Sequence, residues 1–269
     1  MHMLLWGLGA SALVAGVGYR KGSLSESGFW GAVLVGTLIM GFGGVLWFSM
    51  LMAFFISGSA LSHFQRERKG EVEANYAKTG RRDFGQAMAN GGLGSLLAVL
   101  SRTVLSPGAA FALFLGVMAT VSADTWATEI GVLSKQKPRS VLSWREVPPG
   151  TSGGVSLLGT GAAVLGALLV GVVAQIGLWL SAGATHLVPG KPLAAALMGG
   201  VAGCFTDSLL GASCQVIFRC PACGAETEKR EHCGRGTVYL RGYRWLNNDI
   251  VNLLASAVGG LVAALIYLA

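Results

Sequence analysis

The sequence predicts an all-α integral membrane protein, a polytopic bundle of about eight helices that crosses the bilayer repeatedly. Three observations predict this fold class. Of the 269 residues, 52% are hydrophobic, only 12% are charged, and the mean hydropathy is +0.59. A soluble domain carries about 25% charged residues. The hydrophobic residues also gather in runs close to the ~20 residues that span a bilayer.

The apolar runs divide the chain into eight predicted spans, at roughly residues 3–18, 29–43, 45–62, 85–101, 107–123, 154–182, 192–217 and 250–268. The glycines between residues 41 and 44 favour a break between the second span and the third. We expect residues 1–269 to form a single transmembrane domain, with a Cys/His loop at 218–249 inserted in it. The 41 glycines suit close packing of helices in lipid.

The positions of the lysines and arginines predict how the chain crosses the membrane. If the spans alternate, the loops near 19–28, 63–84, 124–153 and 218–249 share one side and hold 2, 6, 4 and 6 of the 20 basic residues. Arg102 and Lys191 fall on the other side. Basic loops favour the cytoplasmic face, so we expect both termini outside. The first run lacks a basic segment before it, which favours a retained helix over a cleaved signal. The net charge of +7 thus indicates inner loops, not a nucleic-acid partner.

The Arg81–Arg82 pair immediately before the fourth predicted span has two interpretations. It belongs to a loop of mixed charge that can anchor the chain to anionic headgroups at the membrane surface. The pair can instead reach the phosphate of a bound ligand.

Acidic residues at the edges of spans mark the expected chemistry. An ionisable group at such depth is costly and usually faces the interior of the bundle. We expect Glu26, Asp124, Glu129, Asp207 and Asp249 to converge on the loop side. Around Asp124 and Glu129, carboxylates and adjacent hydroxyls offer the hard oxygen ligands that Mg²⁺ prefers. Two structural alternatives stay open: the acids near 124 mark a helix end, and Asp207 and Asp249 join nearby asparagines in a hydrogen-bonded cluster.

A glycine- and hydroxyl-rich segment precedes the sixth span: Gly150, Thr151, Ser152, Gly153 and Gly154. Backbone N–H groups in such a turn, together with a helix N-terminus, can bind phosphate. The basic residues Lys137 and Arg139 lie shortly before it. The segment lacks a Walker signature, so it is not a P-loop. A plain turn that opens a helix is the alternative.

The cysteines of the 218–249 loop have metal-ligand spacing: Cys220 and Cys223 form a CxxC pair, followed by His232 and Cys233. Cytoplasmic thiols stay reduced, which disfavours a disulfide. Three cysteines and a histidine fit a tetrahedral structural Zn²⁺ site. Free thiols are the alternative.

Several motifs together resemble a known membrane family. They are Ala123-Asp124-Thr125-Trp126-Ala127-Thr128-Glu129-Ile130-Gly131, Val147-Pro148-Pro149-Gly150-Thr151, Gly153-Gly154-Val155-Ser156, Asp207-Ser208-Leu209-Leu210-Gly211-Ala212, Asn247-Asn248-Asp249-Ile250-Val251-Asn252 and Ala89-Asn90-Gly91. Their order from about residue 20 to the C-terminus resembles the family of domain of unknown function ninety-two, which includes human transmembrane protein nineteen and the plant phytyl-phosphate kinase.

The resemblance implies a Mg²⁺-dependent kinase that phosphorylates an isoprenoid monophosphate (phytyl or other prenyl) to the diphosphate, with CTP as donor. It implies catalytic, metal-binding roles for Asp124 and Asp207, with Asp249 and Glu129 as further metal ligands. The turn at residues 150–154 is then the nucleotide phosphate site, and Asn90 and Asn248 are candidate substrate contacts.

Other functions stay open at this point. A lipid cytidylyltransferase or a prenol kinase would use the same site. A transporter of a lipidic or small anion would place acidic groups near the bilayer midplane on repeated halves, and a scaffold would use the Cys/His loop to bind a partner.

Overall fold

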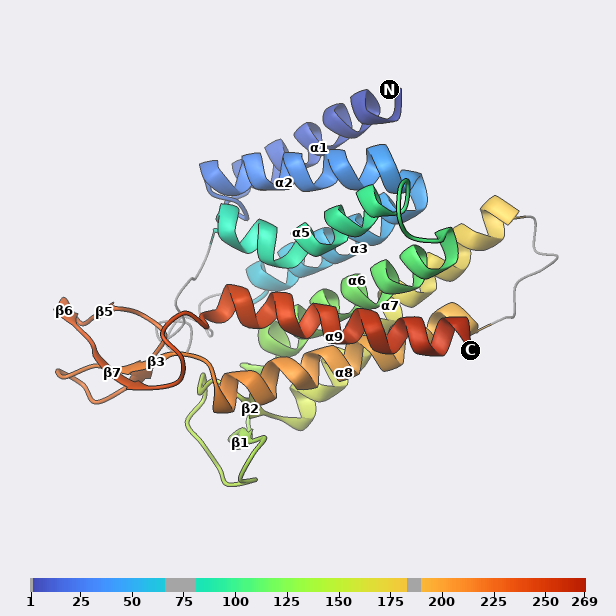
Figure 1. The fold of residues 1–269 in the computed structure, drawn as a ribbon. Coiled ribbons are helices and arrows are strands. Elements are labelled where there is room, and N and C mark those ends of the chain that lie inside the picture. Colours follow the sequence, from blue (N-terminus) through green and yellow to red (C-terminus); the bar gives the residue numbers. More distant parts are fainter. Residues whose placement is uncertain (1, 66–80, 183–189) are drawn as a thin grey trace.

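The computed structural model describes residues 2–65, 81–182 and 190–269 and is an antiparallel helical bundle (Figure 1). Within these residues lie the helices α1 (His2–Arg20), α2 (Glu26–Leu38), α3 (Gly44–His63), α5 (Phe84–Leu100), α6 (Pro107–Gly131), α7 (Leu157–Ala182), α8 (Lys191–Ser213) and α9 (Asn248–Leu268). Each predicted span therefore corresponds to one helix.

Length and hydropathy qualify six segments as candidate membrane spans. One of them, Glu26–His63, contains both α2 and α3, and α5 is too short for the 18-residue criterion. The predicted break is confirmed: a π-helical segment η1 (Ile39–Gly43) ends α2, and Gly44 takes a φ of 81°, so α3 runs back along the bundle. The protein is thus a multi-pass helical membrane protein, as its composition predicts.

Side-chain caps fix several helix starts at one end of the bundle. The Oγ of Ser25 accepts a hydrogen bond from the Gly28 N–H, and the side chain of Asn247 accepts one from the Ile250 N–H. Asp83 and Gln86 form a capping box at the start of α5. These polar residues end the loops and satisfy backbone donors that the first turn of a helix leaves unpaired.

Three predicted boundaries were wrong. Helix α6 continues to Gly131, eight residues past the predicted end of its span, so Asp124 and Glu129 are helical. Helix α8 ends at Ser213, and residues 217–219 form a strand. Helix α7 begins at Leu157 because Gly154–Val155 (β2) pairs with Arg139–Ser140 (β1). Residues 66–80, most of the mixed-charge loop before the fourth predicted span, lie outside the described residues.

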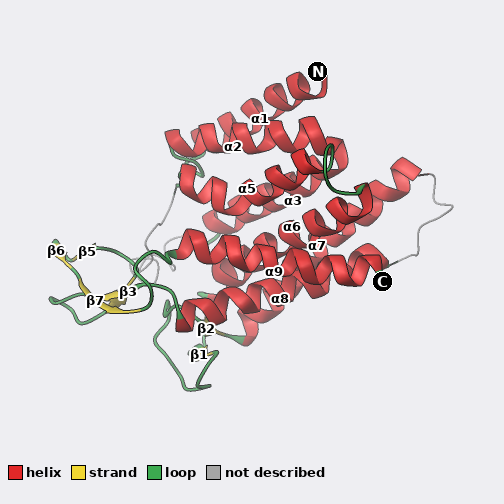
Figure 2. Ribbon diagram, in the orientation of Figure 1, coloured by secondary structure: helices red, strands yellow, loops and turns green. Residues whose placement is uncertain are grey.

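The short strands lie in the loops at one end of the molecule, and both termini lie at the other (Figure 2). The Cys/His loop contains β3 (Ile217–Arg219), β4 (Glu226–Thr227), β5 (Glu231–His232), β6 (Arg235–Gly236) and β7 (Val238–Arg241). Their order is β4-β3-β7 in one sheet and β5-β6 in a hairpin. The described parts of the four basic loops therefore share one end, as alternating spans require; we call it the loop end.

Helix α6 is the centre of the bundle. In its most apolar window 72% of the residues are buried, against 22–44% in the other candidate spans. Helices α3, α5, α7, α8 and α9 all pack on it. The approach of α8 and α9 is close: a Cβ on Gly203 or on Gly259 would overlap the buried Thr120 side chain. This packing holds the last two turns of α6 rigidly at the loop end, where its polar residues lie.

Candidate functional site

Asp124 and Asp207 lie across the interface between α6 and α8. The Asp124 Oδ1 is 4.0 Å from the Cys204 Sγ, and Asp207 follows Cys204 by one helical turn. Asp124 and Glu228 are the acidic groups that act electrostatically on Asp207. The predicted convergence of these two aspartates, 83 positions apart in the chain, is therefore present in the structure.

One oxygen of this pair lacks a protein partner. The Asp207 Oδ2 is buried and accepts no hydrogen bond from the described residues. Leaving a buried polar atom unpaired costs about 1–3 kcal/mol, and more for a charged group. An oxygen in this state is available to a cation, and a second carboxylate beside it increases the attraction.

The glycine turn (residues 150–154) packs on the last turns of α8. Gly153 has a φ of 78°, and a Cβ there would collide with Ala212. On the other side of the contact, a Cβ on Gly211 would lie 2.7 Å from the Ser152 Oγ. Small residues on both surfaces thus place the backbone of the turn four to five positions beyond Asp207 on α8.

A buried glutamine links the turn to the Cys/His loop. The Ser152 Oγ donates to the Gln215 Oε1 at 3.2 Å, and the Gln215 Nε2 donates to the Glu228 Oε1 at 2.7 Å. Gln215 is 1% exposed. The Arg241 guanidinium caps the C-terminal end of α8 by donating to the carbonyl of Ala212 at 2.8 Å.

The predicted basic residues flank the glycine turn. Strand pairing sets Ser140 opposite Gly154, and the Val141 N–H donates to the Gly153 carbonyl at 3.0 Å. The exposed Arg139 lies 4.0 Å from the Glu146 carboxylate. Lys137 is also exposed. Positive charge therefore lies beside the turn at the surface.

A second polar site lies on the opposite side of α6, at Arg82. Its backbone bonds to the 23–25 loop, with Arg82 N–H donating to the Ser23 carbonyl at 3.0 Å. The guanidinium carbon lies 5.3 Å from the centre of the Phe54 ring and 6.0 Å from that of Phe55. Burial lowers the pKa of Arg82, and the nearby Glu129 carboxylate opposes that shift. The Arg82 Nη1 is buried and has no hydrogen-bond partner among the described residues.

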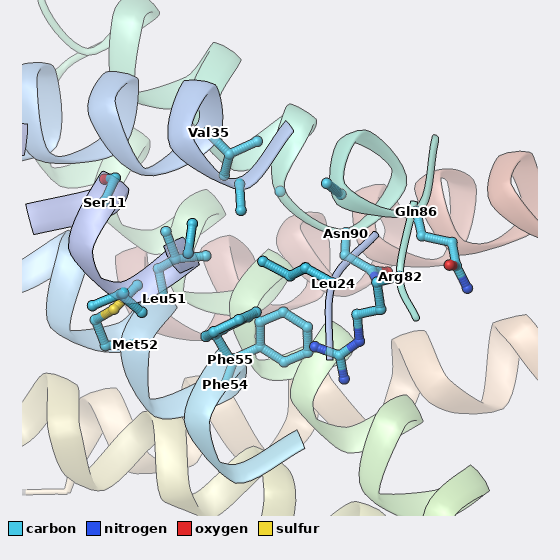
Figure 3. Close-up of a pocket in the computed structure, with 15 residues that line it drawn as sticks. Ser11, Leu24, Val35, Leu51, Met52, Phe54, Phe55, Arg82, Gln86 and Asn90 are labelled. Atoms are coloured by element: carbon cyan, nitrogen blue, oxygen red, sulfur yellow. The ribbon is translucent and has the colours of Figure 1, made fainter. Parts of the chain in front are cut away.

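Arg82 closes one end of an elongated hollow between α1, α2, α3 and α5 (Figure 3). The hollow contains about 560 Å³ of space, including the part open to the outside. Gln86 and Asn90 add polar groups near Arg82, and apolar side chains line the rest, among them Leu24, Val35, Leu51, Met52, Phe54 and Phe55. The predicted substrate contact Asn90 thus lines a cavity that has a cationic group at one end and apolar walls along the rest.

The four predicted magnesium ligands do not gather in one place. The Glu129 carboxylate accepts from the Ser62 Oγ at 2.5 Å and interacts with Arg82, so it faces α3 while Asp124 faces α8. Asp249 and Asn248 lie in the first turn of α9, at the same end of the bundle. Among the described residues, these four carboxylates do not form a compact group of three or more metal-binding side chains.

The predicted zinc ligands do gather. One ligand atom from each of Cys220, Cys223, His232 and Cys233 lies within 4.8 Å of the other three. The His232 Nδ1 is 3.5 Å from the Cys223 Sγ and 3.2 Å from the Cys233 Sγ. Hydrogen bonds, first from the Cys223 backbone, lower the pKa of Cys220 to about 6, which favours its thiolate.

Sequence reasoning missed three residues that connect these groups: Gln215, Glu228 and Arg241. None belongs to a recognisable motif. A polar side chain directly after the apolar α8 was the available signal for Gln215, because a buried amide needs partners. The thiol of Cys204, which no predicted motif includes, also lies next to Asp124.

The chain is similar to several known membrane proteins. It is 30% identical to membrane protein MJ0933 of Methanocaldococcus jannaschii over 246 residues. This match covers 91% of this chain and 86% of that protein. Protein PGR of Arabidopsis thaliana is 29% identical, with 81% of each chain covered. The chloroplastic protein VTE6 of the same plant is 28% identical, with 98% of this chain and 69% of that protein covered.

No solved structure matches the chain. The model of the integral membrane protein family DUF92 matches residues 9–260, which include both aspartates, the glycine turn and Arg82. This chain therefore belongs to the DUF92 family of integral membrane proteins, the family that its sequence motifs resemble.

Proposed function

We propose that this protein is a Mg²⁺-dependent phosphotransferase that converts a prenyl monophosphate to the diphosphate, with CTP as the donor. The observation that carries the proposal is the buried, unpartnered Oδ2 of Asp207, beside Asp124 and against a glycine turn. The reaction class is supported by the motifs, which resemble a family that includes the plant phytyl-phosphate kinase. The basic loops support a cytoplasmic location for this end of the bundle, where nucleotides are available.

The residues around Asp207 fit a magnesium ion. Mg²⁺ binds through one or two carboxylates and completes its shell with waters and substrate phosphates. Asp124 and Asp207 supply those carboxylates, and the free Oδ2 is an open ligand position. When bound, the ion neutralises charge on the transferring phosphate.

The glycine turn is the proposed site for the nucleotide phosphates. Its glycines at 150 and 153 take positive φ values that favour glycine, and at Gly153 a Cβ would also collide with Ala212 of α8. Lys137 and Arg139 flank the turn and attract polyanions. The turn contacts α8 four to five residues beyond Asp207. A donor phosphate that binds both the turn and the metal requires the two to lie close together in this way.

The hollow at Arg82 is the proposed site for the acceptor. A prenyl monophosphate has an anionic head and a long apolar tail, and this cavity has one cationic end and an apolar body. The unpaired Arg82 Nη1 can donate to a phosphate oxygen, and Asn90 supplies an amide nearby. Thr125 and Asp124 are consecutive in α6, and Thr125 and Arg82 both contact the space beside Gly58. The loop end of α6 therefore borders both proposed sites, and the acceptor and donor phosphates would meet at this end of the helix.

The reaction needs alignment and charge neutralisation more than proton transfer. The attacking oxygen belongs to a phosphate that is already anionic near neutral pH, so a general base is not essential. Arg82 holds that phosphate, and the fixed α6–α8 interface keeps the two aspartates in register. Preorganised positioning of this kind supplies most of the rate enhancement in phosphoryl transfer.

The test is a product analysis on the detergent-purified protein with CTP, Mg²⁺ and prenyl monophosphates of several chain lengths. The expected products are the prenyl diphosphate and CDP. Release of pyrophosphate would identify a cytidylyltransferase instead, and turnover of the free prenol would identify an alcohol kinase.

Two variants locate the reaction. Asp124→Asn and Asp207→Asn should abolish turnover while the circular dichroism of the helices stays the same. Glu26 is an exposed acid at the same end of the bundle, and Glu26→Gln should leave turnover unchanged. Full turnover in both aspartate variants would overturn the site.

A further inference from the structure

The Cys/His loop between α8 and α9 consists of a three-stranded sheet and a two-stranded hairpin, with little hydrophobic core of its own. We call this unit the ribbon. Its strands are two to four residues long, and Val238 and Tyr239 of the longest one are largely exposed. Strands this short are at best marginally stable in water without an additional constraint. Small folds of this kind are usually held by disulfides or a metal, and all its cysteines are free thiols.

Two tight turns bring the candidate ligands together. Cys220 and Cys223 flank a turn closed by a hydrogen bond from the Gly224 N–H to the Cys220 carbonyl at 2.9 Å. His232 ends β5, and Cys233 begins the turn to β6 with a φ of 53°. A non-glycine residue in this left-handed region is strained. The strain is explained if it directs the Cys233 thiol towards the other three ligands.

The geometry points to one Zn²⁺ bound by the thiolates of Cys220, Cys223 and Cys233 and by the Nδ1 of His232. All four ligand atoms lie within 4.8 Å of one another. A tetrahedral zinc site has bonds of about 2.3 Å to sulfur and about 2.0 Å to nitrogen, which separates its ligand atoms by somewhat less than that limit. With four protein ligands the site is closed, which is typical of structural zinc and not of catalytic zinc.

The ribbon attaches directly to the loop end of α8, which gives the zinc a structural role. The Tyr243 N–H donates to the Cys214 carbonyl at 2.8 Å, and the Val216 N–H donates to the Leu246 carbonyl at 2.9 Å. Glu228, between the two ligand pairs, accepts from Gln215. Zinc thus fixes the ribbon whose base holds Gln215, and Gln215 in turn holds the glycine turn through Ser152. The inference thus has two parts, the zinc site and its structural role. The structural role rests on the proposed function only in assuming that the glycine turn binds nucleotide.

Metal analysis tests the first part without any activity assay. We expect about one zinc per chain in the protein purified without a histidine tag, and loss of that zinc in Cys220→Ser and Cys223→Ser. Cys214→Ser, three residues before the ribbon's first strand, is the matched control and should keep its zinc. Unoccupied wild-type protein, or zinc retained in both ligand variants, would overturn the proposal.

A second measurement covers the case in which the ligand variants do not fold. The wild-type protein is stripped with a chelator and reloaded with Co²⁺, which takes the place of zinc. The expected result is the intense thiolate-to-cobalt absorption of a tetrahedral, cysteine-rich site; spectra of cobalt bound to oxygen ligands alone would contradict it.

Hydrogen exchange tests the structural role. On chelation, amides of residues 215–246 and of the last turn of α8 should lose protection, and zinc should restore it. Unchanged exchange there would refute the role even if zinc binds. Both readouts are independent of turnover, so their failure is distinguishable from failure of the phosphotransferase proposal.

Discussion

The two halves of the bundle are packed in different ways. Helices α6, α8 and α9 approach so closely that several of their glycines have no room for a Cβ, and the core around Thr120 is filled. Helices α1, α2, α3 and α5 instead surround a hollow, and its space of about 560 Å³ includes the part open to the outside. Each half has an unpaired polar group at the loop end, the Asp207 Oδ2 in the first and the Arg82 Nη1 in the second.

The difference suggests a division of labour. Binding a small, highly charged ion requires carboxylates held with little freedom, and dense small-residue packing provides that rigidity. Binding a flexible chain requires volume and apolar walls, and tight packing would exclude it. The opposite charges of the two unpaired groups match a metal on one side of α6 and a phosphate on the other.

The largest expected effect is in the packed half. Asp207→Asn and Asp124→Asn each remove a proposed metal ligand, and we expect kcat/KM to fall by at least about 100-fold, the upper range for losing a mere outer-shell partner. Turnover at saturating Mg²⁺ measures the effect. Glu129→Gln should lose less, because Glu129 faces Arg82 on the other side of α6. An equal loss in all three variants would contradict the separation of the two sites.

The next effect is in the hollow. Arg82→Lys keeps a positive charge but loses the forked donor geometry, so we expect the KM for prenyl monophosphate to rise about tenfold. The KM for CTP should stay constant. Arg81→Lys is the matched control, since Arg81 is the exposed neighbour. If only the KM for CTP rises, Arg82 binds the donor and not the prenyl monophosphate, which would contradict the proposed acceptor site.

Gly153→Ala tests the glycine turn. The variant combines a φ of 78°, which costs an alanine about 1–2 kcal/mol, with overlap against Ala212. We expect a lower melting temperature and a severalfold higher KM for CTP. Gly190→Ala has a similar φ of 86° but open space around it, so it measures strain alone. If the two variants have the same KM, the turn does not bind nucleotide.

The smallest effect concerns chain length. Ala32 lines the hollow, and Ala32→Phe should fill part of it and shift the preference towards shorter prenyl chains by about tenfold in relative kcat/KM. Leu34→Phe, on the exposed side of the same helix, should leave the preference unchanged. Competition between two chain lengths, followed by mass spectrometry, gives the ratio. No shift would mean that the tail lies elsewhere.

Much of the fold follows from simple sequence rules. Apolar runs and basic loops predicted each α-helix of the described residues and the shared end of the loops, because spanning length and charge asymmetry are properties of local composition. The convergence of Asp124 with Asp207 was predicted from their common depth. The ends of α6 and α8 were not. Hydropathy falls before α6 ends, because its last turns are polar, whereas the apolar run of α8 continues past the helix end towards strand β3.

The rest of the site depends on tertiary contacts. Glu129 and Asp124 were assigned to one metal site, but five residues along a helix place them on different faces. The hollow at Arg82 depends on how α1, α2, α3 and α5 pack, which composition does not specify. Gln215 is a connection between three distant segments, and a single sequence contains no record of it.

The most direct test of the central claim is metal binding itself. Mn²⁺ can replace Mg²⁺ at carboxylate sites and is observable by electron paramagnetic resonance. Titration of the purified protein with Mn²⁺ in the presence of CTP should show a bound ion in the wild type and in Glu26→Gln, and its loss in Asp124→Asn and Asp207→Asn. Undiminished Mn²⁺ binding in both aspartate variants would contradict the account.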